Sequence, residues 1–390
     1  MKFKFVLCLI MITTFLGGVR DGDNMADSSI DFIRIARMFL LFFVFSYLVL
    51  SVNFRKRIAI NGFSLYYFLV VYFAITAIWA PSKLFLFWKL FEVLVLLLFF
   101  LYISQKMLIE DVFSLYGTFF KYLGYAVIGV LITGLMFFDV GFEPLSGSVI
   151  NYKLHGSIYS MNSNDLGFWS GLLLTFSILK KDHYTNNRFY INAFLYGSIL
   201  IFSQARTFLA VSFLVIGFHY GFRKSILTSI IFSILISIIW FFYSDNLFML
   251  FTRGDLAQLE SLHGRTYYWE LGIEYFLKNP ILGHGFYTGH RFLSDIYPES
   301  HFSSMTFDST WVDILVDTGI VGVSIFLLFI FNLLRKMNKI NDPVKIELKV
   351  GFLFLIIRSL TGPSFETFNL FLIYLLMLTF VTNIIVAKHG

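Results

Sequence analysis

Three arginines are conspicuous because the sequence around them is apolar. Arg206 interrupts two apolar runs in "SQARTFLA", Arg265 opens a short amphipathic stretch, and Arg358 lies near the end of another apolar run. A cation in or beside hydrocarbon is energetically costly and is usually functional. Arg206 and Arg358 could also be helix ends whose side chains snorkel to the membrane surface. The three residues therefore indicate a candidate site for an anionic ligand.

Residues 265–278, "RTYYWELGIEYFLK", have the pattern of an amphipathic helix that lies on a membrane surface. One face of this predicted helix carries Arg265, Trp269, Gly272, Ile273 and Phe276. Glu274 and Lys278 are spaced for an i,i+4 pair on the other side. Asn279-Pro280 predicts the end of the helix, because a residue before proline is disfavoured in the helical region. The alternative is that this helix only packs over the remaining helices.

Arg265 is poorly placed for the helix dipole, which favours anions in the first turn of a helix. An anion bound by both the helix N-terminus and the guanidinium group would resolve this conflict. The position of Arg265 therefore favours a ligand-binding role.

The first candidate for a general base is Asp308, which precedes the apolar run "STWVDILVDTGIVGVSIFLL". It would lie at the outer end of that helix, where it could serve as an N-cap instead of a base. His301 and Glu270 are alternative bases, and histidine titrates near neutral pH. A zinc site made by His284, His290 and His301 is not expected, because their spacing matches no tight ligand pattern.

Other polar and aromatic side chains could contact a sugar, a lipid or each other. The candidates for substrate binding, besides Arg358, are Tyr267, Tyr268, Trp269, Glu270, Arg291 and His301. Lys89 and Glu92 are three residues apart in one apolar run and predict a structural ion pair. Arg34 and Arg37 begin another run and predict contacts with lipid headgroups.

Transmembrane helices are expected to position these residues. Of the 390 residues, 58% are hydrophobic and 14% are charged, whereas about one quarter of a soluble domain is charged. About twelve apolar runs are long enough to cross roughly 30 Å of hydrocarbon. They lie near 3–19, 34–52, 63–80, 84–103, 112–138, 164–180, 189–204, 206–222, 225–243, 309–334, 347–361 and 367–387. We expect an all-α integral membrane protein with one polytopic domain over 1–390. The first run could instead be a signal peptide, although no cleavage site is clear.

The distribution of charge predicts the topology. Basic clusters at 55–57, 180–188, 223–224 and 335–345 fall in alternate loops and share one side with both chain ends. The opposite loops, beginning with 21–31, are acidic or mixed. Because Lys and Arg collect in cytoplasmic loops, both termini are predicted to be cytoplasmic. The net charge of +6 then follows from topology and does not indicate nucleic-acid binding.

Two of the predicted outer loops, 139–163 and 244–308, are long, and long loops without an obvious structural duty are usually functional. We therefore expect an active site that faces outward, with a long helical loop over 244–308. The single cysteine, Cys8, excludes an intrachain disulfide and a cysteine-rich metal site.

Several segments resemble motifs of the O-antigen ligase and polymerase family. "SQARTFLAVSFLV", "GRTYYWELGIEYFLKNPILGHGF" and "DSTWVDILVDTGIVG" occur in this order, and "MNSNDLGFWSGLLL" resembles that family's asparagine-containing start of a middle helix. The resemblance covers roughly residues 160–325. It implies a glycosyltransferase of the bacterial inner membrane whose active site faces the periplasm.

The resemblance also implies the substrates and the site residues. Donor and acceptor would be glycans on undecaprenyl diphosphate, and no cofactor, metal or nucleotide sugar is expected. Membrane lipids and a chain-length regulator protein would be the partners. By position, Arg206 and Arg265 would hold the diphosphate leaving group and stabilise its charge. Together with Asp308 they are the expected catalytic residues.

One position departs from the family pattern. Ligase-type members have a histidine where this chain has Asp308, and that histidine is the one assigned to activating the acceptor hydroxyl. The aspartate favours a polymerase, which joins repeat units while the growing chain stays on its lipid. The first alternative is a ligase that moves finished glycan to lipid A-core. A flippase is the alternative from another class, but transporters tend to use repeated, interrupted helices, and no repeat is visible here.

Overall fold

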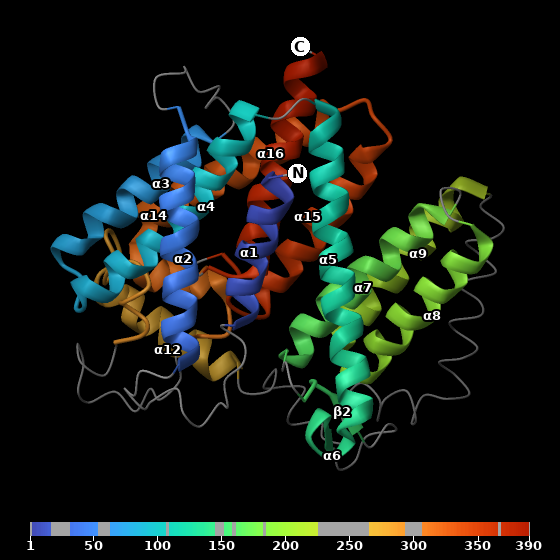
Figure 1. Ribbon diagram of the computed structural model, residues 1–390. Coiled ribbons are helices and arrows are strands. Elements are labelled where there is room, and N and C mark those ends of the chain that lie inside the picture. The colour runs from blue at the N-terminus through green and yellow to red at the C-terminus, as the bar shows by residue number, and fades with distance from the viewer. Residues whose placement is uncertain are drawn as a thin grey trace. The chain divides into compact units, whose positions relative to one another are not determined.

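The structure is a computed structural model of the chain. It describes residues 2–16, 32–53, 63–106, 109–144, 152–157, 161–181, 185–224, 265–292, 306–365 and 368–389. These residues form thirteen α-helices, one short 3₁₀ helix and a pair of three-residue strands. The predicted all-α class is therefore confirmed for the described part of the chain (Figure 1).

The chain divides into two compact units, and each is described by itself. The first unit takes residues 1–17, 29–118 and 264–390, and the second takes 18–28 and 119–263. The elements of the first unit are α1 (Lys2–Leu16), α2 (Phe32–Ser51), α3 (Ser64–Ile75), η3 (Thr76–Ile78), α4 (Lys83–Lys106), α12 (Arg265–Lys278), α14 (Thr310–Asn338), α15 (Val344–Leu360) and α16 (Leu370–His389). The elements of the second unit are α6 (Phe138–Gly141), β1 (Phe142–Pro144), β2 (Tyr152–Leu154), α7 (Ser163–Leu179), α8 (Asn186–Ser203) and α9 (Arg206–Lys224). Helix α5 (Ile109–Met136) contains the boundary between them.

The predicted apolar runs correspond to helices wherever the structure describes them. The run at 225–243 lies outside the described residues, and so do residues 244–264 and 293–305 of the long predicted loop. Four described helices, α4, α5, α14 and α16, are long and apolar enough to cross a membrane, and four shorter helices are also apolar. These features are consistent with a multi-pass membrane protein. The orientation of the helices stays a prediction.

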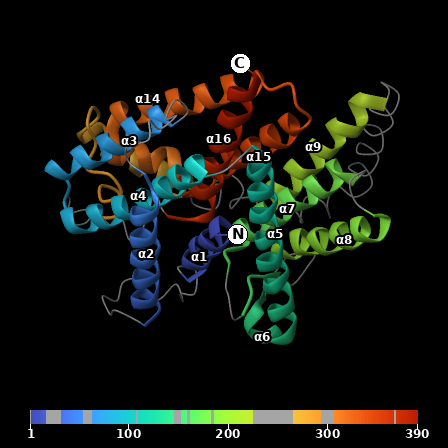
Figure 2. The same cartoon turned by 45° about the horizontal axis from the view of Figure 1, so that its top comes forward.

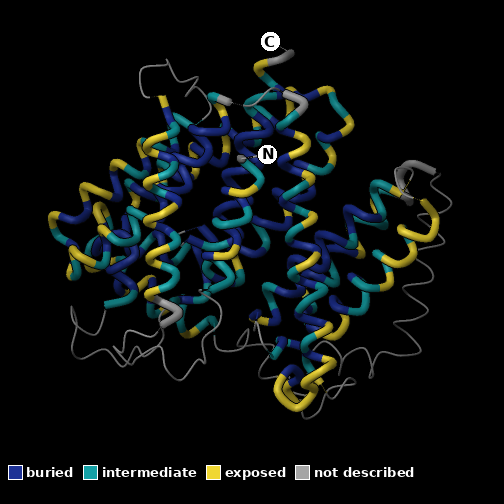
Figure 3. The backbone as a smooth tube through the Cα atoms, in the orientation of Figure 1, coloured by how far each residue is buried: buried dark blue, intermediate teal, exposed yellow. Residues whose placement is uncertain are grey.

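Helix α16 lies at the centre of the first unit. Every residue from 370 to 382 is buried, so this helix is dark along most of its length in Figure 3. The outer faces of α2 and α3 instead expose large apolar side chains such as Phe39, Phe43 and Phe68. Exposed aromatic residues of this kind suit helices that face lipid rather than water.

Helix α14 is interrupted at Gly319, and this break shapes the region around the candidate site. Gly319 has φ 61° and ψ −166°, a conformation open essentially to glycine alone. The break releases backbone groups from the helical hydrogen-bond pattern, and inside a membrane such groups need other partners. Residues 279–292 supply them: the N–H groups of His284 and Gly285 donate to the carbonyls of Val316 and Asp317 at 2.9 and 2.8 Å.

The same connection also contacts the helix on the other side of the break. The Ile320 N–H donates to the Pro280 carbonyl at 2.9 Å. The Tyr72 hydroxyl of α3 donates to the Thr318 carbonyl at 2.9 Å, and the Phe286 N–H donates to the Thr76 hydroxyl at 2.9 Å. Residues 279–292 are therefore fixed between α3 and α14, which lie side by side in both views (Figures 1 and 2).

Helix α12 has the predicted bounds, and only part of its apolar face packs against α14. Gly272 allows a close approach to α14, since a Cβ there would lie 2.3 Å from a methyl carbon of Val312. Tyr275 is buried with Phe307 and Val316, whereas Ile273 is exposed. Helix α14 therefore covers a strip of α12 that contains Gly272 and Tyr275 but not Ile273.

The predicted ends and ion pairs of these helices are largely confirmed. Helix α12 ends before Asn279-Pro280, and Lys278 lies 3.6 Å from Glu274. Lys89 and Glu92 form the expected pair at 3.0 Å. Arg37 was expected to contact headgroups, but its guanidinium donates to the same Glu92 carboxylate at 2.7 Å.

Candidate functional site

The predicted residues Arg265, Asp308 and Arg358 lie together in the first unit. Arg265 is the first residue of α12, is half-buried, and interacts electrostatically with both Asp308 and Arg358. Burial lowers the pKa of the Arg265 guanidinium, Asp308 raises it and Arg358 lowers it, so that the net pKa falls below its usual value. No described residue hydrogen-bonds to this guanidinium. Arg265 therefore interacts with one like charge, Arg358, and one opposite charge, Asp308. This arrangement suits the binding of an additional anion.

Asp308 is held in an unusual backbone conformation directly before α14. Its φ is 54°, in the left-handed region that aspartate tolerates better than most residues. Its N–H donates to the Thr306 hydroxyl at 3.0 Å, while its half-buried carboxylate accepts no hydrogen bond from the described residues. The N-cap interpretation is wrong, because Ser309 occupies that position. The carboxylate is thus available to a substrate.

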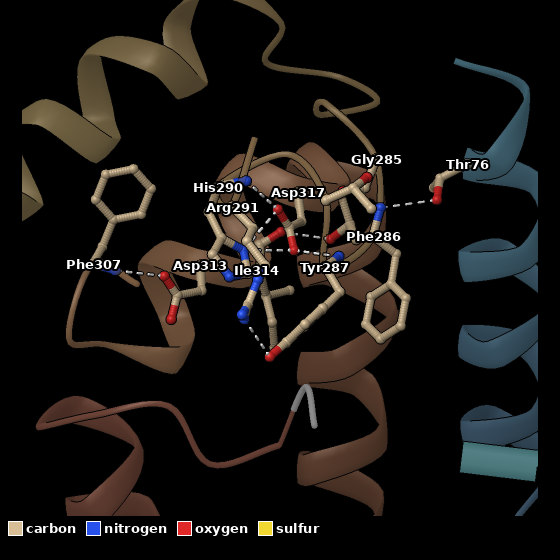
Figure 4. A network of polar contacts seen from close by, with 12 residues as sticks. Thr76, Gly285, Phe286, Tyr287, His290, Arg291, Phe307, Asp313, Ile314 and Asp317 are labelled. Carbon is tan, nitrogen blue, oxygen red and sulfur yellow. Dashed lines mark hydrogen bonds and ion pairs between the residues drawn. The ribbon is translucent and has the colours of Figure 1, made fainter. Parts of the chain in front are cut away.

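A second carboxylate fixes the turn that carries Asp308. Asp313, in the first turn of α14, is fully buried, and one of its oxygens accepts the Phe307 N–H at 2.8 Å (Figure 4). Its other oxygen is buried without a hydrogen-bond partner in the described part of the chain. Asp313 therefore constrains the backbone immediately before Asp308.

Arg358 lies in the last turn of α15 and is only 5% exposed. Its guanidinium packs over the Phe371 ring, 5.0 Å from the centroid, and against Gly362, where a Cβ would lie 1.8 Å from Nη1. The Thr310 hydroxyl at the start of α14 donates to the Gly362 carbonyl at 3.0 Å. The end of α15 is therefore attached to the start of α14, next to Asp308.

A buried network that the sequence interpretation did not predict lies deeper along α14. The Asp317 carboxylate accepts hydrogen bonds from the Tyr287 N–H, from the His290 N–H at 2.8 Å, and from the His290 ring Nδ1 at 2.9 Å (Figure 4). His290 and Asp317 are both almost completely buried. Burial lowers the pKa of His290, but the charges of Asp317 and Asp313 and the Asp317 hydrogen bond raise it more, so the net pKa is above 6.5. This buried pair joins residues 284–292 to α14.

The histidines considered for zinc have protein partners instead. The ring of His284 hydrogen-bonds to the Tyr275 carbonyl at 2.9 Å, and that of His290 to Asp317. His301 lies outside the described residues. No group of three His, Cys, Asp or Glu residues in the described ranges could hold a metal ion.

The remaining candidates for substrate binding divide by exposure. Glu270 and Tyr267 are exposed on α12, whereas Tyr268 is half-buried against the Tyr275–Phe307–Val316 cluster. Trp269 is half-buried, and its indole N–H has no hydrogen-bond partner among the residues described. Arg291 is also half-buried, and it lies away from this group, beside Tyr287 and Phe85.

Arg206 belongs to the second unit and begins α9, as predicted. Gln204 at the end of α8 is left-handed with φ 53°, and its side chain donates to the Tyr152 carbonyl at 3.1 Å. Gly167 of α7 lets this turn approach, because a Cβ there would meet the Ala205 Cβ at 2.0 Å. The predicted meeting of Arg206 with Arg265 stays a prediction.

Comparison with known proteins shows similarity in the part of the chain that contains most of the candidate site residues. Residues 191–327 match the family model described as O-antigen ligase. The matched segment is 137 of the 390 residues. The chain is also similar to the exopolysaccharide production protein ExoQ of Rhizobium meliloti (strain 1021), with 24% identity over 242 residues. That match covers 55% of this chain and 54% of ExoQ, so the chain spans about half the length of the curated relative.

The segment matched by the family model includes three of the predicted site residues, Arg206, Arg265 and Asp308, as well as the His290–Asp317 pair. Arg358 follows this segment in the chain, interacts electrostatically with Arg265, and lies against Gly362, whose carbonyl accepts a hydrogen bond from Thr310. Members of this family are membrane glycosyltransferases of the ligase and polymerase type. The family resemblance drawn from the motifs is therefore confirmed.

Proposed function

We propose that this protein is a polysaccharide polymerase that joins lipid-linked oligosaccharide repeat units. The observation that carries the proposal is the grouping of Arg265, Arg358 and Asp308 at the ends of three helices of the first unit. Two cations suit a diphosphate leaving group, and a carboxylate without a donor among the described residues suits the activation of a hydroxyl. The undecaprenyl diphosphate carrier is inferred from the family resemblance.

The reaction is a single displacement. The acceptor sugar hydroxyl loses its proton to the Asp308 carboxylate as its oxygen forms a bond to the anomeric carbon of the donor. The bond between that carbon and the diphosphate oxygen breaks, and the electron pair leaves with the diphosphate. Arg265 and Arg358 stabilise the charge that develops there, together with Arg206 if the second unit contributes it. Because attack and departure occur on opposite faces, the anomeric centre inverts.

An aspartate at position 308 favours polymerisation over ligation, since ligase-type members have a histidine there. A polymerase is also compatible with the similarity to ExoQ, an exopolysaccharide production protein. Lipid-linked donor and acceptor would meet at the periplasmic face of the inner membrane, with both chain termini in the cytoplasm.

Replacement of Arg265 or Arg206 by alanine tests this function in cells. We expect either variant to lose the ladder of long surface polysaccharide on a gel and to retain a band with a single repeat unit. Complete loss of glycan on the lipid A-core, including the single-repeat band, would instead indicate a ligase. A full-length ladder in both variants contradicts the proposed site.

An assay with purified protein distinguishes a polymerase from a transporter. Protein in detergent has no second compartment, so extension of lipid-linked repeat units there requires glycosyl transfer. Extension supports the polymerase, and absence of extension with the native repeat unit contradicts it.

A further inference from the structure

The hydroxyl group of Thr310 joins two chain segments that carry candidate site residues. Thr310 is the first residue of α14, two positions after Asp308, and it is completely buried. Its Oγ1 donates to the Gly362 carbonyl at 3.0 Å and accepts a hydrogen bond from the Ser364 N–H at 2.7 Å. One hydroxyl group therefore attaches the start of α14 to the segment that follows α15.

Both partners of this hydroxyl are backbone groups beyond the end of a helix. Gly362 and Ser364 follow Thr361, the C-cap residue of α15, and both are buried. Pro363 lies between them and has no N–H group to donate. The Ser364 hydroxyl also donates to the Gly362 carbonyl, but over a longer distance of 3.3 Å. Because buried backbone groups need partners, the path of residues 362–364 depends on Thr310.

The turn that Thr310 holds lies directly against the Arg358 guanidinium. A Cβ atom at Gly362 would lie 1.8 Å from Nη1 and 2.7 Å from Cζ of Arg358. The same guanidinium lies over the Phe371 ring, 5.0 Å from its centroid. Arg358 is only 5% exposed, and a closely packed interior leaves a side chain little room to move. A shift of the Gly362 backbone would therefore shift this cation.

A second hydrogen bond joins the same two helices and bypasses the turn at 361–364. The Trp311 indole N–H donates to the Ser359 hydroxyl at 3.0 Å, and that hydroxyl donates to the Ile356 carbonyl of its own helix at 2.7 Å. Ser359 is completely buried, as Thr310 is. Both bonds support the packing of α15 on α14. Of the two, only the Thr310 bond reaches the turn against which Arg358 lies.

The position of Arg358 affects the rest of the candidate site through its charge. Arg265 interacts electrostatically with both Asp308 and Arg358. Such interactions depend on distance and are weakly screened between buried groups. A displaced Arg358 would therefore change the field that a bound anion meets beside Arg265.

We propose that Thr310 is a positioning residue that holds the Arg358 guanidinium in place relative to Asp308. The inference rests on the proposed function, in which Arg358 stabilises the departing diphosphate while Asp308 accepts the proton of the acceptor hydroxyl. Both events belong to one displacement, so the cation and the carboxylate have to be correctly placed at the same time. Thr310 follows Asp308 closely in the chain and bonds to the turn beside Arg358, so it relates the two positions.

The initial rate of repeat-unit extension by the purified full-length protein tests this inference. Thr310→Val keeps the shape of the side chain and removes the hydroxyl, so we expect kcat to fall about 10–100-fold. Thr310→Ser keeps the hydroxyl and should stay within about threefold of wild type. Ser359→Ala removes the other buried hydroxyl between the same helices and should also stay within about threefold. A wild-type rate in Thr310→Val, or an equal loss in Ser359→Ala, overturns the inference.

A double-mutant cycle separates the positioning of Arg358 from a general structural role. Arg358→Ala removes the guanidinium, so the addition of Thr310→Val to this variant should cause no further loss of kcat. A loss of the same size in both backgrounds would show that Thr310 acts independently of Arg358, and it would overturn the inference.

Gly362→Ala displaces Arg358 and leaves the Thr310 hydroxyl unchanged. The added carbon would lie 1.8 Å from Nη1 of Arg358, at the end of a flexible side chain, so the guanidinium has to move. We expect a loss of kcat similar to that of Thr310→Val, and no further loss in the Arg358→Ala background. This variant keeps the inference testable if Thr310→Val does not fold. A wild-type rate in Gly362→Ala overturns the inference.

The failure of this inference can be told apart from the failure of the proposed function. If the wild-type protein extends repeats and Thr310→Val does so equally fast, the positioning role alone is wrong. A wild-type rate in Arg358→Ala removes Arg358 from the site, and the inference fails while the polymerase assignment stands. A wild-type protein that does not extend repeats contradicts the proposed function, and the inference fails with it.

Discussion

The Phe307 N–H donates a hydrogen bond to the buried Asp313 carboxylate at 2.8 Å, and this bond closes the turn that carries Asp308. Within the described part of the chain, Asp313 makes no hydrogen bond or ion pair with Arg265, Asp308 or Arg358. It acts on the proposed base through the backbone, and it is therefore a positioning residue.

Replacement of Asp313 by leucine should lower kcat for repeat-unit extension and leave KM nearly unchanged. The buried Phe307 N–H would lose its acceptor, which costs about 1–3 kcal/mol, and the left-handed turn at Asp308 would relax. Asp313→Asn keeps an acceptor oxygen and should retain most of the rate. In an Asp308→Asn background, Asp313→Leu should cause no further loss of kcat. An additive loss would show that Asp313 acts independently of Asp308.

The His290–Asp317 pair predicts a pH dependence of stability. Burial lowers the pKa of His290, but the charges of Asp317 and Asp313 and the hydrogen bond raise it more, to a net value above 6.5. A raised histidine pKa stabilises the fold fully below the unfolded value and loses that contribution as pH rises through the folded value. Thermal unfolding in detergent should therefore show a falling Tm as the pH rises above 6.5. His290→Gln should flatten this slope, and an unchanged slope would contradict the assignment.

The break in α14 predicts an unusual sensitivity to a single methyl group. At Gly319, alanine would adopt a strained backbone with φ 61°, and its Cβ would lie 2.3 Å from the Ile281 carbonyl oxygen. We expect Gly319→Ala to lower the free energy of unfolding by at least about 2 kcal/mol. The matched control is Gly117→Ala in α5, where no atom lies within 4 Å of the added carbon. That variant should be neutral or slightly stabilising, because alanine favours helices. Equal effects of the two substitutions would mean that the break is not required.

The sequence predicted the elements that depend on local pattern. Hydrophobic runs located the helices, and the Asn279-Pro280 step located the end of α12. Arg265 was recognised because a cation conflicts with the dipole at the start of a helix. Each of these signals lies within a few residues of the feature it predicts.

The parts that were missed depend on contacts between distant segments. His290 and Asp317 are 27 residues apart, and no spacing rule relates them. The burial of Tyr275 rather than Ile273 depends on where α14 lies against α12. Two signals were nevertheless present: Asp313 and Asp317 are charged residues inside an apolar run, and Gly319 lies two residues after Asp317. An acidic residue in a membrane helix marks function, and a glycine there marks a break or a close approach.

The predicted meeting of Arg206 and Arg265 can be tested directly because the chain has one natural cysteine. In a Cys8→Ser background, cysteines at the neighbouring positions Thr207 and Thr266 should be joined by a short bifunctional maleimide. A link between Thr207→Cys and the exposed position Tyr190→Cys of α8 is not expected and serves as the control. If the first pair reacts no better than a chain with one of the two cysteines, Arg206 does not share a cavity with Arg265.

The most direct test of the central claim is the initial rate at which purified Asp308→Asn extends lipid-linked repeat units. Asparagine keeps the shape of the side chain but does not accept the hydroxyl proton, so the rate should fall by roughly 10²–10⁴-fold. Glu274→Gln, a matched change of an exposed carboxylate on α12 that is not a candidate for the site, should leave the rate within about twofold of wild type, because general-base catalysis does not pass through it. A wild-type rate in Asp308→Asn would contradict the assignment of Asp308 as the base.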